Sequence, residues 1–305
     1  MHNPIRIGTR ESQLAVWQAT RVQQLLEQQG YASELVYIRS EGDVDLTTPL
    51  YEMGVQGIFT RSLDIALLDN RIDLAVHSMK DVPTRLPQGI TQAAVLERGP
   101  VSDLLVLGKN AGPLDDAHYI ANIATSSIRR KAQWLHRYPA HQLHNLRGNV
   151  NTRLRKLEES AWDGAIFAQA GLERISLRPE NSIVLNWMLP APAQGAIVAV
   201  CREADTQVLD ACMHFNNHHA ALCTTIERDF LRTLLGGCST PISALAVVQD
   251  GQLVFKGNIL SLDGSKKVEI EKVVMERDAE GLGQEAAYEL LANGGQAIAD
   301  SIRND

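Results

Sequence analysis

Short apolar runs alternate with amphipathic segments along the first two thirds of the chain, which predicts strands followed by helices. Gly30 stands in the usual glycine position just past a helix end. Strands that alternate with helices favour mostly parallel sheets with helices on both faces. The expected strands are Ile5–Gly8, Glu34–Ile38, Asp73–His77, Ile120–Thr125, Leu143–Arg147 and Asp163–Ala168, and the expected helices are Glu11–Gln29, Phe59–Leu68, Ser127–Arg137 and Val150–Glu159.

The last third of the chain has a different pattern, with strands grouped together after a long helix. Asp250 and Gly251 form a hairpin turn signal between the first two of these strands. Such grouping is typical of a small α+β domain. The expected elements are the helix Ala220–Leu235, which ends at Gly236-Gly237, the strands Ser243–Val248, Gln252–Leu260 and Lys267–Val274, and a final helix Gly281–Asn293.

Proline and glycine mark two connectors, Arg98-Gly99-Pro100 and Leu189-Pro190-Ala191-Pro192, which indicate hinges between domains. A return of the chain to the first domain after the second connector is expected. The predicted division is an α/β domain of residues 1–97 and 193–215, a second α/β domain of residues 98–192, and an α+β domain of residues 216–305.

Composition indicates a globular protein, since 45% of the 305 residues are hydrophobic and 21% are charged. The net charge of -7 argues against general nucleic-acid binding, which favours a basic domain. The chain start has no apolar signal-peptide core, and no apolar stretch approaches the length that spans a bilayer, so a cytoplasmic location is expected. The four cysteines form no C-x-x-C pair and are expected to be free thiols.

Basic residues gather where predicted strands give way to helices. Arg129 and Arg130 follow one strand, and Arg147 and Arg153 follow the next. Ligands of open α/β sheets bind at the carboxyl ends of strands, where helix N-termini offer free N–H groups. The guanidinium fork also matches carboxylate oxygens. The pattern therefore indicates a site for a carboxylate-rich ligand, with a solvated helix face and ordinary salt bridges as the alternative.

Two further residues are candidates for chemistry. Asp81 lies just beyond the predicted buried strand Asp73–His77, where a carboxylate would stabilise a cation or move a proton. The alternative is that Asp81 caps a turn before Pro83. Cys238 follows two glycines on a loop, where a thiol is more accessible than in a core. The alternative for Cys238 is a small apolar filler.

Cysteines and histidines cluster between Cys212 and Cys223, and these residue types are common metal ligands. His214 and His218 are spaced to share a helix face. Asn216-Asn217 is expected to interrupt that helix, and no paired-cysteine spacing completes a zinc pattern. No metal is therefore expected. The glycine-rich nucleotide loops and the serine-hydrolase elbow are also absent from the sequence.

Six stretches, in order and over nearly the whole chain, resemble the hydroxymethylbilane synthase (porphobilinogen deaminase) family. They are Ile7–Ser12, Ala75–Pro83, Thr125–Arg130, Leu146–Arg153, Ala193–Ala196, and Glu227-Arg228 leading to Gly236–Ile242. The resemblance implies two periplasmic-binding-protein-like α/β domains plus a small C-terminal α+β domain. It also implies a monomeric enzyme of tetrapyrrole and heme biosynthesis that condenses four porphobilinogen molecules head to tail, with loss of ammonia, and releases the linear tetrapyrrole by hydrolysis.

The resemblance assigns roles to individual residues. Cys238 would carry a dipyrromethane cofactor through a thioether, and Asp81 would be the catalytic carboxylate. Every pyrrole ring carries an acetate and a propionate, so basic residues would neutralise the charge that a growing chain collects. The implied cofactor-binding residues besides Cys238 are Lys80, Asp81, Thr125, Ser126, Ser127, Arg129, Arg130, Arg147, Gly148, Arg153 and Gln194. The implied substrate-binding residues are Arg10, Ser12, Arg147, Arg153 and Arg174.

The chain departs from the family pattern at three positions. Glu41 and Gln56 stand where family members usually have basic residues, and Ser243 replaces a common glycine, a minor change. The two lost charges would weaken substrate capture or change loop closure, with Arg61 compensating in part. A family member that holds the cofactor but turns over poorly is therefore one alternative function.

Two functions from other classes would explain part of the sequence. A non-catalytic solute-binding protein would explain two lobes and an arginine-rich site, but it would not explain Asp81 together with Cys238, and it would normally need an export signal. A nucleic-acid binder would use the region of Arg129–Arg153, but the net charge and the lack of an aromatic stacking motif argue against it.

Overall fold

The computed structural model of the chain describes residues 3–39, 60–109, 111–114, 116, 118–234 and 240–304. These residues form two compact units, and each is described by itself. Apart from the gaps just named, the first unit holds residues 3–39, 60–99 and 195–222, and the second holds residues 100–194 and 223–304. The chain thus leaves the first unit after Gly99 and returns to it at Gly195. The three-domain division stays a prediction.

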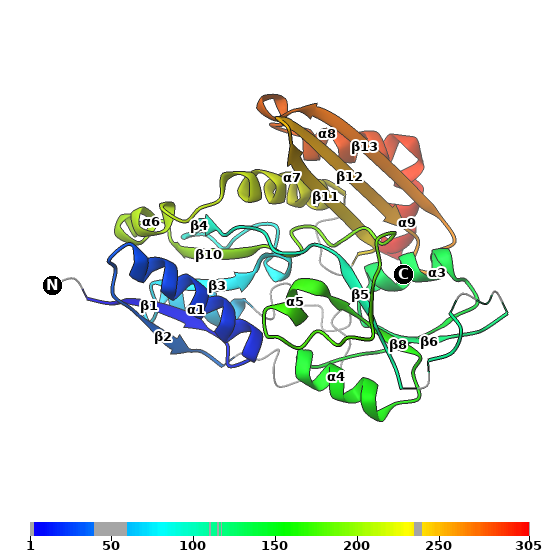
Figure 1. The fold of residues 1–305 in the computed structure, drawn as a ribbon. Helices are drawn as coiled ribbons and strands as arrows, with labels where there is room; N and C mark the ends of the chain where they lie inside the picture. The colour runs from blue at the N-terminus through cyan, green and yellow to red at the C-terminus, as the bar shows by residue number, and fades with distance from the viewer. Residues whose placement is uncertain are drawn as a thin grey trace. The chain divides into compact units, whose positions relative to one another are not determined.

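A five-stranded sheet forms the centre of the first unit (Figure 1). Its elements are β1 (Ile5–Thr9), α1 (Gln13–Gln28), β2 (Ser33–Tyr37), α2 (Arg61–Leu68), β3 (Leu74–Ser78), the 3-10 turn η2 (Met79–Asp81), β4 (Ile90–Val95), β10 (Ile197–Arg202) and α6 (Thr206–Met213). The strand order is β2-β1-β3-β10-β4. β1 pairs in parallel with β2 and β3, whereas β10 is antiparallel to both β3 and β4. Four of the five strands therefore run in one direction.

The strands direct successive side chains to opposite faces of the sheet, and helices cover both faces. Ile7 on β1 and Leu74 on β3 pack with Val22 and Leu26 of α1 in one buried cluster. On the other face, a Cβ at Gly8 would lie 2.2 Å from Ile72 Cδ1. Because Gly8 has no side chain, Ile72, which lies between α2 and β3, can approach the sheet.

The second unit contains another five-stranded sheet, with the same pattern of strand directions from edge to edge. Its elements are β5 (Asp103–Leu107), β6 (Asn122–Ala124), α3 (Ile128–Arg137), β7 (Gln142–His144), α4 (Val150–Glu159), β8 (Gly164–Ala168), α5 (Gln169–Glu173) and β9 (Ser182–Val184). The strand order is β7-β6-β8-β5-β9, with β6 parallel to β7 and β8, and β5 antiparallel to β8 and β9. The mixed α/β fold class predicted from the sequence is confirmed by these two sheets.

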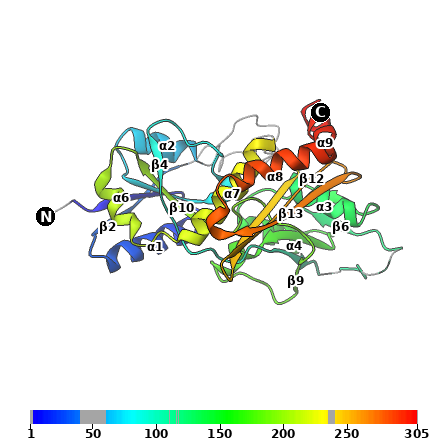
Figure 2. The same cartoon turned by 90° about the horizontal axis from the view of Figure 1, so that it is seen from above.

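The last part of the chain adds a three-stranded antiparallel sheet covered by helices. Its elements are α7 (His218–Leu234), β11 (Ile242–Gln249), β12 (Gln252–Leu260), β13 (Lys267–Met275), η3 (Glu276–Asp278), α8 (Leu282–Leu290), the π-helical turn η4 (Leu291–Gly295) and α9 (Gln296–Asn304). Figure 2 shows α8 lying along β13, and these elements are in contact. The Phe230 ring of α7 packs against Phe255 on β12, with ring centroids 5.1 Å apart.

Two sequence expectations for this region meet different outcomes. The Asp250-Gly251 hairpin is confirmed, since both residues have positive φ and Gln249 pairs with Gln252. The expected helix Gly281–Asn293 corresponds to α8 and the turn after it, but it is not the final helix, because α9 follows. Asn293 and Gly294 have non-helical backbone angles, with a φ of 103° at Gly294, so a kink separates the two helices. The buried Ile298 and Ala299 show that the apolar face continues beyond it.

No described helix combines the length and the apolar composition that crossing a membrane requires.

A charged cluster ties together three segments of the first unit. The Asp73 carboxylate accepts hydrogen bonds from Arg6 Nε at 2.9 Å, Arg6 Nη2 at 2.8 Å and Arg202 Nη2 at 2.8 Å. Burial raises the pKa of Asp73, but the hydrogen bonds from Arg6 and Arg202 outweigh it and lower this pKa to about 2. The ionised carboxylate therefore stabilises the folded state at neutral pH.

We expect Asp73→Asn to lower the free energy of unfolding at pH 7 by about 1–2 kcal/mol, since the side chain is partly exposed. Because the folded-state pKa lies below the unfolded value of about 4, this stabilisation is complete above pH ~5 and is lost as the pH falls toward 2. Urea unfolding of the two proteins at several pH values between 7 and 3 measures the difference. A difference that stays constant as the pH falls would contradict this assignment.

Candidate functional site

Several predicted site residues of the second unit lie at one edge of its sheet. The parallel strands β6, β7 and β8 end at this edge, and the antiparallel β5 begins there. Thr125 follows β6, and Arg147 lies a few residues after β7. Asp103, the first residue of β5, pairs with Ala168, the last residue of β8. Residues distant in sequence therefore meet where α/β sheets bind ligands.

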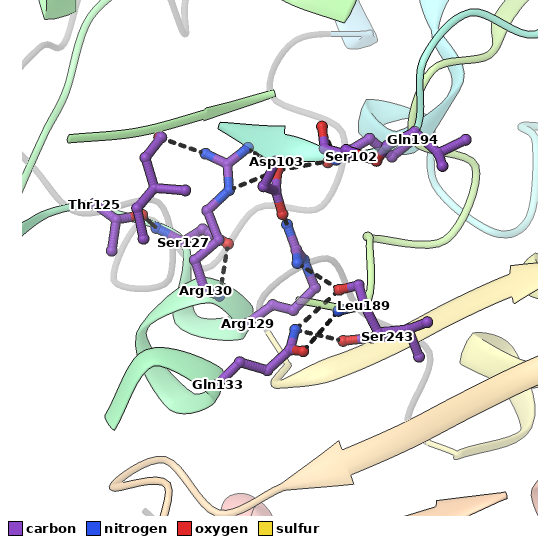
Figure 3. A network of polar contacts seen from close by, with 12 residues as sticks. Ser102, Asp103, Thr125, Ser127, Arg129, Arg130, Gln133, Leu189, Gln194 and Ser243 are labelled. Carbon is purple, nitrogen blue, oxygen red and sulfur yellow. Dashed lines mark hydrogen bonds and ion pairs between the residues drawn. The ribbon is translucent and has the colours of Figure 1, made fainter. Parts of the chain in front are cut away.

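The Asp103 carboxylate lies between two arginines at this edge (Figure 3). Arg129 Nη2 donates to Asp103 Oδ2 at 2.7 Å, and Arg130 donates to Asp103 Oδ1 from Nη2 at 2.7 Å and from Nε at 3.1 Å. The side chains of Arg129, Arg130 and Asp103 are 5%, 7% and 0% exposed. Both arginines are predicted to bind the cofactor, and each already forms an ion pair with a carboxylate of this chain.

Backbone carbonyls complete the support of the two guanidinium groups. Arg129 Nη1 donates to the carbonyl oxygen of Leu189 at 2.7 Å, and Arg130 Nη1 donates to that of Ile166 at 2.9 Å. Gln133, one turn further along α3, bonds to both backbone groups of Leu189 at 2.9 Å. These contacts connect the start of α3 with β8 and with the connector before Pro190.

Gln194 joins the same network. Its Nε2 donates to Asp103 Oδ1 at 2.9 Å and to the carbonyl oxygen of Val101 at 2.7 Å (Figure 3). The preceding residue, Ala193, has a φ of 60° and donates its N–H to Glu227 Oε2 at 2.6 Å. The structure therefore places the Gln194 amide within the network that holds the arginines.

The electrostatic balance of the network favours an ionised Asp103. Burial raises the pKa of the Asp103 carboxyl, but the charges and hydrogen bonds of Arg129 and Arg130 outweigh it and hold this pKa far below its usual range. Two guanidinium groups and one carboxylate leave one net positive charge. Arg129 Nε is buried and has no hydrogen-bond partner among the described residues, so the network retains a donor for an anion.

Three predicted hydroxyl residues organise the start of α3. Ser127 caps this helix by accepting from the Arg130 N–H, and Thr125 Oγ1 accepts from the Ser127 N–H at 3.2 Å. Ser126 Oγ accepts from the Leu146 N–H at 2.8 Å, which ties the β6–α3 junction to the residues after β7. Because each hydroxyl oxygen is the acceptor in these bonds, the hydroxyl hydrogens remain compatible with donation to a ligand.

The β7–α4 junction brings together Arg147, Gly148 and Arg153. Arg153 Nε donates to the carbonyl oxygen of Gly148 at 2.7 Å, and Asn149 caps α4 by accepting from the Thr152 N–H at 2.9 Å. Gly148 has a φ of 112°, and a Cβ there would lie 2.7 Å from Thr152 Cγ2. The residue at this position must therefore be glycine for both conformational and steric reasons.

Arg174 follows α5, beyond the end of β8. Burial lowers the pKa of Arg174 to about 10, which leaves the guanidinium charged at neutral pH. The predicted role of Arg174 in substrate binding stays a prediction.

The first unit carries the remaining predicted residues at the corresponding edge of its own sheet. Arg10 follows β1, and Lys80 and Asp81 lie in η2 directly after β3, both half-buried. The Met79 N–H donates to the carbonyl oxygen of Ala196 at 3.0 Å, which anchors the turn that carries Asp81. Ser12 caps α1 by accepting from the Ala15 N–H.

His77 lies on β3 next to this edge. Burial first, and the positive charge of Arg10 second, lower the pKa of His77 to about 3, so its imidazole is neutral at physiological pH. His77 Nε2 is buried and has no hydrogen-bond partner in the described part of the chain. Sequence analysis gave this histidine no separate role.

Three predicted features lie outside the described residues: Cys238, Glu41 and Gln56. The other three cysteines are buried. Burial raises the pKa of the Cys201 thiol to about 11 and that of Cys212 to about 12, which disfavours thiolate formation at either. Among the described residues, no group of three or more histidine, cysteine or acidic side chains is arranged to hold a metal ion.

Sequence analysis missed the residues that organise this site. Asp103 precedes the apolar run Leu104–Leu107, and this run was not among the expected strands. An acidic residue beginning a buried strand was the available signal. Ser243, regarded as a minor departure, is buried and accepts a hydrogen bond from Gln133 Nε2 at 3.0 Å. No local pattern predicts that contact, because 110 residues separate the two partners.

Comparisons with known proteins cover most of the chain. Residues 5–210 match the family described as "Porphobilinogen deaminase, dipyromethane cofactor binding domain", and residues 221–292 match "Porphobilinogen deaminase, C-terminal domain". Similar proteins include the porphobilinogen deaminase of Syntrophomonas wolfei, 43% identical over 96% of this chain and 97% of the relative. That of Moorella thermoacetica is 41% identical over 98% of this chain and 96% of the relative.

A solved structure of the Bordetella pertussis BvgS VFT2 domain covers 72% of this chain and 91% of its own, with a TM-score of 0.42 and 14% identity. A likeness this distant supports no functional conclusion.

We expect Gly148→Ala to destabilise the protein by about 2–3 kcal/mol, since it combines an unfavourable φ with a steric clash against Thr152. Gly251→Ala is the matched control, because Gly251 also has positive φ but a Cβ there meets nothing within 4 Å. The control should lose about 1 kcal/mol from backbone strain alone. Thermal unfolding followed by circular dichroism measures both, and equal losses would show that the contact with Thr152 is relieved without cost.

Proposed function

This chain belongs to the porphobilinogen deaminase family, and from that premise we propose how its residues assemble a linear tetrapyrrole from porphobilinogen. The activity is that of a hydroxymethylbilane synthase, a transferase of tetrapyrrole and heme biosynthesis. Four porphobilinogen molecules are condensed head to tail with loss of ammonia, and hydrolysis releases the product. The observation that carries the assignment of the binding residues is the positively charged strand edge around Arg129, with its buried unpaired Nε donor.

The residues of this edge fit a dipyrromethane group, whose acetate and propionate side chains are carboxylates. Arg129 retains a buried donor that a carboxylate oxygen would satisfy, and Arg147, Gly148 and Arg153 share one strand-to-helix junction beside it. Hydroxyl groups of Thr125, Ser126 and Ser127 would add donors. When bound, the dipyrromethane supplies the pyrrole carbon to which the first substrate unit is joined. We propose Cys238 as its point of covalent attachment.

Asp81 is the proposed catalytic residue. Loss of ammonia from porphobilinogen leaves an electron-poor pyrrole with positive charge at its N–H, which a carboxylate stabilises. The same carboxylate would assist proton transfer at the reacting carbons. The hydrogen bond from Met79 N–H to Ala196 holds the turn that carries Asp81 in place. Lys80, Arg10, Ser12 and Arg174 would bind carboxylates of the cofactor or the substrate.

The proposal also covers Gln194, the cellular location, the oligomeric state and the domain division. Gln194, whose Nε2 donates to Val101 and Asp103, is also proposed to bind the cofactor. A cytoplasmic location, a monomeric state and a division into three domains complete the proposal. Poor turnover resulting from Glu41 and Gln56 is the alternative within the family.

The intact mass of the purified protein under denaturing conditions tests the proposed function. We expect a mass above that of the sequence by one dipyrromethane unit, which Cys238→Ala should abolish. Brief exposure to porphobilinogen should add a ladder of equal pyrrole steps. An adduct without a ladder would favour the poorly active alternative, and bare sequence mass in folded protein under both conditions would refute the assignment.

We expect Asp81→Asn to reduce turnover by two or more orders of magnitude, since the amide keeps the shape but removes the negative charge. Because Asp81 acts on the reacting pyrrole, the covalent adduct should remain in the intact mass. Single-turnover consumption of porphobilinogen measures the loss. Turnover at the rate of the unmodified protein would remove Asp81 from the catalytic role.

A further inference from the structure

We infer that Asp103 is a positioning residue for cofactor capture, because it holds the guanidinium groups of Arg129 and Arg130 together and lowers their joint charge to one positive unit. This inference rests on the proposed function. It assigns to a buried carboxylate, which is bonded to side chains of the protein itself, the task of arranging the residues that bind the cofactor.

Two neighbouring arginines would not occupy this arrangement without a shared acceptor. Arg129 and Arg130 are consecutive, and both side chains are almost fully buried, where repulsion between like charges is poorly screened. Asp103 gives one carboxylate oxygen to each arginine, at 2.7 Å in both cases. A buried charge that loses its partner is strongly unfavourable. Asp103 therefore determines where both guanidinium groups lie.

The network distinguishes the two arginines. Arg130 uses Nε, Nη1 and Nη2 in bonds to Asp103 and to the carbonyl oxygen of Ile166. Arg129 uses only Nη1 and Nη2, and its buried Nε has no partner among the described residues. Asp103 thus anchors Arg130 on two of its three nitrogens, whereas Arg129 keeps one buried donor, Nε, that a ligand carboxylate would satisfy.

Among the described residues, Asp103 is the acidic side chain that pairs with each of the two arginines. The other acceptors, at Leu189 and Ile166, are neutral backbone carbonyls whose positions belong to the connector and to β8. Gln194 donates to the same Asp103 oxygen that accepts from Arg130. Replacing Asp103 therefore alters the position and charge of the arginine pair while every basic residue of the site is retained.

The test compares Asp103→Asn with the unmodified protein and with Asp163→Asn. Asp163 is the matched control, since it is 3% exposed and accepts hydrogen bonds from the N–H groups of Gly112 and Asn122 and from Tyr119, none of which is a proposed ligand residue. Each protein is examined for secondary structure and thermal unfolding by circular dichroism, and for covalent adduct by intact mass. Adduct occupancy is measured well below the unfolding temperature of every variant.

We expect both substitutions to lower the unfolding temperature, because each removes a buried hydrogen-bonded carboxylate. Only Asp103→Asn should reduce adduct occupancy, on the order of tenfold, since asparagine replaces one of the two acceptor oxygens with an NH₂ group that cannot accept from an arginine. In a background where both Arg129 and Arg130 are replaced by Gln, Asp103→Asn should change occupancy by no more than about twofold, because the residue acts through the pair. A merely structural role would give independent, multiplicative losses instead.

The outcomes separate this inference from the proposed function. An unmodified protein without adduct would refute both. An unmodified protein with adduct, together with folded Asp103→Asn at full occupancy, or with a loss equal to that of Asp163→Asn, would overturn the role of Asp103 alone. If Asp103→Asn does not fold, Asp103→Glu replaces it, because it keeps the charge and displaces the oxygens by one methylene. Full occupancy in that variant would also overturn the positioning role.

Discussion

A carboxylate removed from water must be paired, and Asp103 satisfies this requirement with two arginines and one glutamine. Much of the second unit depends on this pairing. The two carboxylate oxygens of Asp103, at the start of β5, bind the first turn of α3 and the segment that leads out of the unit. Because β5 is antiparallel to β8, its first residue reaches the edge where the parallel strands end. The direction of one strand therefore places a negative charge among the residues expected to bind anions.

Sequence patterns predicted most of the elements and the strand-to-helix junctions that carry Arg129 and Arg147. They did not predict β4, β5, β9 or β10, whose short apolar runs gain their partners only through tertiary pairing. For the same reason the contact between Asp103 and the arginines was not foreseen. The last helix, α9, was not predicted, because Gly294 and Gly295 are typical of a helix end, whereas the buried Ile298 and Ala299 give α9 an apolar face of its own.

The terminal sheet is connected to the same helix that carries the two arginines. His136 Nδ1 lies 2.8 Å from the carbonyl oxygen of Gly264 in the β12–β13 turn, and Gln133 bonds to Ser243 on β11. A Cβ at Gly264 would lie 2.5 Å from the carbonyl oxygen of Ala132, so the turn fits against α3 without a side chain. Fully buried Glu227 adds a second link, since it accepts from Ala193 and Ala246. Residues on both sides of Cys238 are thereby linked to α3 and to the connector at Ala193.

The return of the chain to the first sheet has a consequence for protein synthesis. β4 pairs with β10, which begins 102 residues (197 minus 95) after β4 ends. At ribosomal rates of about 5–20 residues per second, β4 would wait roughly 5–20 s for its neighbour. The second sheet, in contrast, is encoded without interruption between residues 103 and 184. On the ribosome, the strands of the second five-stranded sheet are all present before the first can close, so the nascent chain completes these two sheets in the reverse of the order in which they begin.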